Sequence, residues 1–256
     1  MDTEKPLLEK LLYRLIKKHI AGSTINSAIN KAKELNRKGI NASITYLSNN
    51  IEGREQINYI VSTYKELSRR LRISNVNATL HIPINQIGYE LDPSIIYDYI
   101  EDLEETHNKN GVFTWLEMRE INRKLLKFIN EDTHGMGIAI PIELINKLGN
   151  FEKPIKIICN EKIDTNALKK VLQYKQQQVL QHPPIGIINK INTKNIVFEF
   201  QYGYKTKKVS KLAKSKKVSV YLPFGKNWEK FAKNLIPEGY MRILANKILK
   251  EEENHG

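Results

Sequence analysis

The sequence predicts an α/β protein with a distorted (βα)8 barrel of the TIM type, N-terminal helices and one shortened βα unit. Strand-like segments alternate with segments of helical period along most of the chain. Eight segments have strand character, and eight parallel βα units close into a barrel. A length of 256 residues suits such a barrel as a single domain. We therefore expect one domain over residues 1–256, with N-terminal helices over 1–40 and the barrel over 41–256.

Two helices are expected before the barrel. Apolar residues recur at helical spacing from Leu7 to Ile16, which predicts a helix over residues 5–20. Gly22 interrupts this pattern, and Ser23 is a candidate N-cap for a second helix. The apolar face of that helix runs from Ile25 to Leu35, and Gly39 ends it.

The predicted strands share short apolar or alternating patterns bounded by turn residues. They are Ala42–Leu47, Ala78–Ile87, Val112–Met118, Gly137–Ile142, Ile155–Cys159, Ile185–Ile188, Val197–Tyr202 and Val218–Leu222.

The predicted helices between and after these strands show apolar positions three and four residues apart. They are Glu55–Leu71, Pro93–Leu103, Ile121–Ile129, a short helix ending at Leu148, Asn166–Leu180, Trp228–Ile236 and Met241–Leu249. Only residues 189–196 remain between the predicted strands Ile185–Ile188 and Val197–Tyr202. Parallel neighbours need a crossover of about a dozen residues. This is the unit that we expect to be shortened.

The chain is basic, with a formal net charge of +13, which would attract polyanions. The densest part is Lys205–Lys217, where Val209, Leu212 and Ala213 recur at helical spacing. This pattern favours an amphipathic helix with a solvated lysine face. The run lacks the interleaved aromatic residues that stack on bases, so nucleic-acid binding is the less favoured interpretation.

The remaining composition excludes several classes of protein. No apolar run approaches the roughly 18 residues of a membrane span. A single cysteine, Cys159, excludes an internal disulfide and fits the reducing cytoplasm. The six histidines show no metal-ligand spacing, so we expect no metal site.

Several stretches, kept in order along the chain, resemble the proline dehydrogenase family. They are Gln86-Ile87-Gly88 after the second strand, Trp115-Leu116-Glu117-Met118 on the third, Phe198–Gly203 on the seventh, and Tyr221–Gly225 followed by Trp228 on the eighth. The family has a distorted (βα)8 barrel that binds FAD, with the flavin at the carboxyl ends of the strands. It transfers a hydride from proline to the flavin and passes the electrons to a quinone or another acceptor.

The resemblance implies a set of site residues. Tyr221 matches a tyrosine that lines the proline pocket, Glu117 stands where the family usually has an aspartate, and Glu238 matches a glutamate near the end of the domain. These three are the expected catalytic residues. Lys156, at the position of an arginine near the flavin N5, and Gln86 are the expected cofactor-binding residues.

The chain also departs from the family pattern. Asn234 and Leu235 replace two arginines that hold the proline carboxylate, and neither can form a bidentate clamp. Pro83 replaces a lysine on the second strand. Three hypotheses therefore stay open: a flavin-dependent oxidoreductase acting on proline or a related amine or imino acid, a catalytically inactive barrel that binds or assembles, and a basic polyanion-binding protein.

Overall fold

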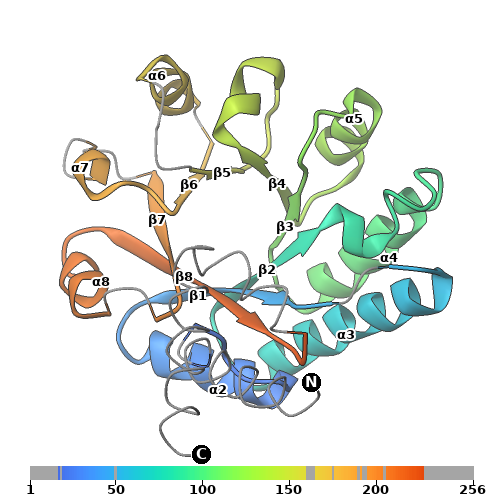
Figure 1. Cartoon of the computed structure of the whole chain (residues 1–256), viewed down its shortest axis with the longest axis horizontal. Helices are drawn as coiled ribbons and strands as arrows, with labels where there is room; N and C mark the ends of the chain where they lie inside the picture. The colour runs from blue at the N-terminus through green and yellow to red at the C-terminus, as the bar shows by residue number, and fades with distance from the viewer. Residues whose placement is uncertain are drawn as a thin grey trace, which may run out of the picture.

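The chain folds as a closed barrel of eight parallel strands, in the order β1-β2-β3-β4-β5-β6-β7-β8 (Figure 1). The computed structural model describes residues 17, 19–48, 51–159, 165–174, 176–188, 191, 195–203 and 206–227. The predicted fold class is confirmed. The predicted closing helices and the positions of Glu238, Asn234 and Leu235 lie outside the described residues.

Each strand pairs in parallel with the next, and β8 pairs with β1 to close the barrel. The strands are β1 (Asn41–Tyr46), β2 (Ala78–Pro83), β3 (Thr114–Glu117), β4 (Met136–Pro141), β5 (Ile155–Ile158), β6 (Gln178–Gln181), β7 (Ile196–Gln201) and β8 (Lys217–Phe224).

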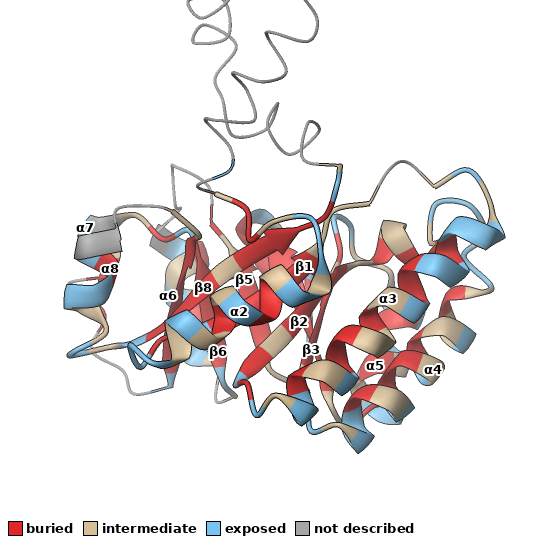
Figure 2. Cartoon of the chain, turned by 90° about the horizontal axis from the view of Figure 1, so that it is seen from below, coloured by how far each residue is buried: buried red, intermediate tan, exposed pale blue. Residues whose placement is uncertain are grey.

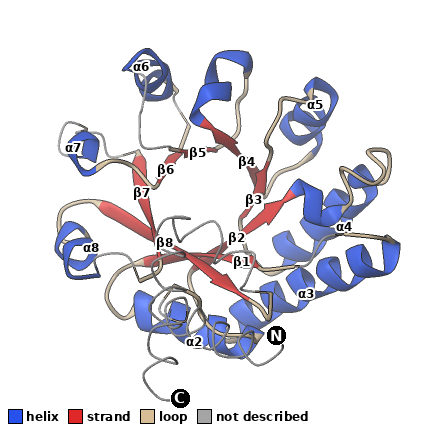
Figure 3. Ribbon diagram, viewed as in Figure 1, coloured by secondary structure: helices blue, strands red, loops and turns tan. Residues whose placement is uncertain are grey.

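Helices form the outer ring around these strands (Figure 3). They are α2 (Ile25–Asn36), α3 (Arg54–Ile73), η1 (Ile84–Ile87), α4 (Ile96–Lys109), α5 (Arg123–Asp132), η2 (Ile142–Lys147), α6 (Thr165–Gln173), α7 (Ile185–Ile188) and α8 (Thr206–Leu212). The elements η1 and η2 are 3₁₀ helices, and η1 occupies the end of the segment predicted as the second strand.

The sequence prediction misplaced the sixth strand. Ile185–Ile188 forms the short helix α7, and the sixth strand is Gln178–Gln181, which overlaps the end of the predicted helix Asn166–Leu180. The glutamines at both ends of β6 hide its strand character. Pro183 and Pro184 directly precede α7, and the Pro184 carbonyl accepts hydrogen bonds from the backbone N–H groups of Ile187 and Ile188 at 3.0 and 3.4 Å. The crossover from β6 to β7 therefore has room for a helix, although only a helix of four residues.

The helix α2 covers the side of the barrel where β1 meets β8. Its N-cap is Thr24 and not the predicted Ser23. The Thr24 side chain accepts a hydrogen bond from the Ser27 backbone N–H at 3.2 Å, and the Ser27 hydroxyl lies 3.2 Å from the Thr24 backbone N–H. This capping box satisfies two donors that a helix start otherwise leaves unpaired.

The main hydrophobic core lies between the strands and the surrounding helices (Figure 2). Ile44, Leu80, Leu116 and Ile138 are fully buried there and lie on the outward face of their strands. A second, smaller apolar cluster fills part of the barrel interior and contains Trp115, Ala139, Val179 and Val197. It lies on the opposite strand face because successive strand side chains alternate.

The lysine-rich segment forms α8, as predicted. Val209 is buried, and Leu212 and Ala213 pack against the main core, whereas Lys208 and Lys211 are exposed. The helix thus buries its apolar positions and solvates its lysines. Among the described helices, none combines the length and apolar character needed to cross a membrane.

Candidate active site

A polar layer lies directly above the apolar cluster of the barrel interior. Glu117, Gln181 and Glu199 each follow a member of that cluster by two positions on β3, β6 and β7, and therefore share its inward face. They stand nearer the carboxyl ends of the strands. That end of a (βα)8 barrel is where active sites are built.

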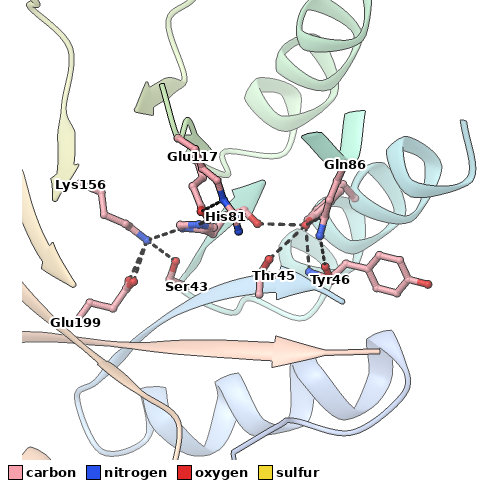
Figure 4. A network of polar contacts seen from close by, with 10 residues as sticks. Ser43, Thr45, Tyr46, His81, Gln86, Glu117, Lys156 and Glu199 are labelled. Atoms are coloured by element: carbon pink, nitrogen blue, oxygen red, sulfur yellow. Dashed lines mark hydrogen bonds and ion pairs between the residues drawn. The ribbon is translucent and has the colours of Figure 1, made fainter. Parts of the chain in front are cut away.

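Lys156 is the centre of this layer. Its side chain is fully buried, and its ammonium lies 3.0 and 3.1 Å from the two carboxylate oxygens of Glu199. The ammonium also donates to Ser43 Oγ at 2.8 Å and lies 3.3 Å from His81 Nδ1 (Figure 4). An ammonium has three donors, and these partners use all three.

The environment of Lys156 contains opposing influences on its charge. Burial lowers the pKa of Lys156, and the Glu199 carboxylate opposes that shift. The ammonium also lies 5.2 Å from the centre of the Trp115 ring, an arrangement in which the ring face attracts the cation. Gly137 allows the ring to take this position, because a Cβ there would come within 2.9 Å of it.

His81 connects Lys156 to Glu117. His81 Nε2 lies 2.7 Å from Glu117 Oε2, and the ring is buried whereas 17% of the Glu117 side chain is exposed. Burial, followed by the nearby Lys156 charge, lowers the pKa of His81. Burial opposes ionisation of Glu117, but the hydrogen bond and charge of its neighbours outweigh it and lower the pKa of this carboxyl.

Tyr221 contributes an aromatic ring to the same polar layer, where it packs against two histidine rings. Its ring packs edge-on against His81 with centroids 5.1 Å apart, and against His182 at 6.3 Å. Burial, then the charge of Glu117, raises the pKa of Tyr221 well above its ordinary value, so the hydroxyl stays protonated. His182 follows β6 with a positive φ of 57°.

Gln181 carries a polar atom that the described structure leaves without a partner. The side chain is 3% exposed, and among the described residues no group hydrogen-bonds its Oε1. A buried acceptor without a donor is costly. Because Gln181 ends β6 on the inward face, its Oε1 is suited to accept an N–H from a bound ligand.

Gln86 lies at the edge of the site and is already engaged. The β1–β2 ladder ends at Ile44 and Leu80, and beyond it the Tyr64 hydroxyl lies 3.1 Å from both the Tyr46 N–H and the His81 carbonyl. Gln86 donates to the Tyr46 carbonyl at 3.0 Å and accepts from the Tyr64 hydroxyl at 3.1 Å. Gln86 and Tyr64 therefore complete the backbone pairing where the strands separate.

The structure brings three of the five predicted site residues together around His81: Glu117, Lys156 and Tyr221. Gln86 is joined to them indirectly, through Tyr64 and then the His81 carbonyl or the Thr45 hydroxyl. Glu238 lies outside the described residues. Among described residues, no group of three or more His, Cys, Asp or Glu side chains is placed to hold a metal ion.

Sequence reasoning missed His81 and Glu199. Each is a charged or titratable residue at an inward position of an otherwise apolar strand, which was the available signal, since such burial is costly without a partner. Gln181 was missed because most of its strand was predicted as helix, which placed Gln181 just after a helix and not at a strand end.

Comparison with known proteins supports the same fold. No family model matches the chain. Proline dehydrogenase 1 of Bacillus subtilis (strain 168) is 18% identical over 266 residues, which cover 87% of this chain and 86% of that protein. The same protein of Bacillus subtilis subsp. natto gives the same identity and coverage.

Solved structures of proline utilization A (PutA) are also similar. The structure from Bdellovibrio bacteriovorus, inactivated by N-propargylglycine, has a TM-score of 0.68 at 12% identity over 89% of this chain. The structure from Corynebacterium freiburgense has a TM-score of 0.68 at 13% identity over 92%. This chain spans 33% of each of those chains. At these identities the likeness establishes the barrel fold.

Proposed function

We propose that the protein is a proline dehydrogenase-like oxidoreductase that transfers a hydride from proline, or a related amine or imino acid, to FAD. The observation that carries this proposal is the similarity to proline dehydrogenase 1, which extends over 87% of the chain. Glu117 and Tyr221 both contact His81 in the barrel interior, and the carboxyl end of such a barrel is where active sites are built. A quinone is the proposed electron acceptor, and the cytoplasm the proposed location.

A bound flavin would supply the hydride acceptor. Gln181 Oε1, an unpaired and buried acceptor, fits an N–H of a flavin ring. Lys156 would act on the flavin through its charge, because its three donors are used by Ser43, His81 and Glu199. Gln86 would support the site by holding the end of β1.

Within this proposal, the substrate would lie beside Tyr221 and Glu117. The Tyr221 ring would exclude water from one side of the substrate, and the Glu117 carboxylate would face its nitrogen. Glu238 remains the third proposed catalytic residue. Asn234 and Leu235 cannot form the bidentate hydrogen bonds with a substrate carboxylate that two arginines would form. We therefore propose that the protein recognises the amine group of the substrate.

A spectroscopic experiment tests the proposal. The purified protein is mixed with FAD, its visible spectrum is recorded, and proline or pyrrolidine, which is the same ring without the carboxylate, is added without oxygen. We expect bound flavin to bleach with either compound, and the two to differ in kcat/KM by about tenfold or less, since no arginine pair selects the acid.

Two variants provide the controls. Glu117→Gln should lower the bleaching rate about 100-fold or more. Glu105→Gln, which alters an exposed carboxylate on α4, should leave the rate unchanged. A protein that takes up no flavin would contradict the proposal and favour the inactive barrel. That alternative has one observation in its support, namely that the polar groups of Lys156 and Gln86 are already bonded within the protein.

A further inference from the structure

One hydrogen-bonded network crosses the barrel interior from its carboxyl end to its centre. It consists of Glu117, His81, Lys156 and Glu199, which we call the interior acid–base network (Figure 4). Its members come from β3, β2, β5 and β7. Only Glu117 has an appreciable exposed fraction, 17% of its side chain against 1% or less for the other three.

The chemistry of the partners assigns every proton in this network. The Lys156 ammonium can only donate, so His81 Nδ1 must accept from it. The Glu117 carboxylate can only accept, so His81 Nε2 must carry the hydrogen that it donates. His81 is therefore a neutral ring in one fixed tautomer, between a cation and an anion.

The network carries one uncompensated negative charge. Lys156 and Glu199 neutralise each other and His81 is neutral, so the remaining charge is that of Glu117. His81 occupies one carboxylate oxygen of Glu117. The nearest described cation to the other oxygen is Arg119, whose Nε lies 3.9 Å away on a side chain that is 79% exposed. One oxygen of this half-buried carboxylate is thus left for a ligand at the barrel mouth.

We propose that His81 is the positioning residue of an acid–base site in which Glu117 takes the proton from the ammonium of an amine substrate. This proposal rests on the function proposed above and adds the residues that enable the first step. The N–H bond breaks, an O–H bond forms on the free oxygen of Glu117, and the electron pair stays on nitrogen. The neutral amine could then give a hydride from its adjacent carbon to the flavin of the proposed function, which would leave an iminium product, and Glu117 would return its proton to water.

Several titratable groups face His81 and define its state. They are Glu117 from β3, Lys156 from β5, Glu199 from β7, Tyr221 from β8 and His182 after β6. Burial and the Lys156 charge disfavour a proton on Nδ1. The ring therefore remains a donor to Glu117 and does not compete with it for the substrate proton.

Two matched variants test the role of His81 in turnover. His81→Gln retains an N–H donor near the position of Nε2, whereas His81→Leu removes it. With leucine we expect the acid limb of the kcat/KM profile to move to higher pH, because Glu117 loses the bond that favours its ionised form, with roughly tenfold lower kcat/KM on the acid side. With glutamine the limb should stay near the wild-type position. An unmoved limb in His81→Leu would overturn the proposal.

A measurement that needs no turnover separates this proposal from the function on which it rests. In flavin-free protein, ¹⁵N spectra of the histidine rings should show His81 protonated on Nε2 and unprotonated on Nδ1 at neutral pH, with the signal assigned by its loss in His81→Gln. Pyrrolidine should perturb the Glu117 carboxyl signal in wild type, and Glu117→Gln should abolish the binding. The opposite tautomer, or no response to pyrrolidine, would overturn the proposal. If both results hold and no flavin binds, only the proposed oxidoreductase fails.

Discussion

Two ion pairs of this protein show that distance alone does not decide how much stability is lost when a salt bridge is broken. Lys65 and Asp102 join α3 to α4 with 2.5 Å between Nζ and Oδ1, and their side chains are 35% and 45% exposed. Lys156 and Glu199 lie 3.0 Å apart in the barrel interior and are 0% and 1% exposed. The longer contact is the one whose disruption should cost more stability, because a charge left alone in the interior cannot return to water.

The difference lies in what remains when one partner is removed. On the surface, water replaces the lost partner, and the pair is screened by salt. In the interior, the surviving charge stays in a site of low dielectric without the partner that it contacts directly. The interior pair therefore fixes the arrangement of the site more strongly than it adds net stability.

The largest effect should follow from breaking the interior pair. Glu199→Leu leaves the Lys156 ammonium without its carboxylate, and we expect the free energy of unfolding to fall by about 3–5 kcal/mol. Urea unfolding followed by circular dichroism measures the change. The double variant Lys156→Met with Glu199→Leu removes both charges and should recover most of the loss. A double variant as unstable as the single one would show that the charge is not the cause.

A smaller effect concerns pH and a buried histidine outside the site. His107 is 1% exposed, its Nδ1 lies 2.7 Å from Thr114 Oγ1, and burial lowers the pKa of His107 to about 4. Between pH 6.5 and 4, His107 therefore binds a proton in the unfolded chain but stays neutral in the folded protein. The free energy of unfolding consequently falls as the pH falls.

The expected loss from His107 over this window is about 3 kcal/mol. His107→Leu should reduce the pH slope of the unfolding free energy by nearly one proton. The slopes are compared by urea unfolding at a series of pH values. His81 and His182, whose pKa values burial also lowers, keep part of the slope in the variant. An unchanged slope in His107→Leu would contradict the assignment.

The smallest effect should come from the surface pair. Asp102→Ala removes the partner of Lys65, and we expect a loss of about 0.5 kcal/mol that diminishes further in high salt. The same urea titrations detect it. A loss comparable to that of Glu199→Leu would remove the distinction between the two pairs.

The sequence predicted the parts of the fold that depend on local pattern. Alternating strand and helical periods identified the barrel class, and the Val209, Leu212 and Ala213 spacing identified the buried face of α8. The prediction of the sixth strand was wrong for two reasons. The glutamines at the two ends of β6 resemble a polar helix end, and Ile185–Ile188 is apolar enough for a strand. Pairing with β5 and β7 selects the strand there, and neither neighbour is visible in the local pattern.

The sequence by itself determined the alternation of strand and helical segments that defines the barrel class, since that alternation is a local pattern of apolar residues. It also placed Glu117, Lys156 and Tyr221 on strands. Only the tertiary structure decided that Lys156 meets Ser43, His81 and Glu199, which lie 113, 75 and 43 residues away along the chain. Closure of the barrel brings these strands to one centre, and electrostatic pairing depends on distance in space and on exclusion of water, neither of which is a local property of the chain.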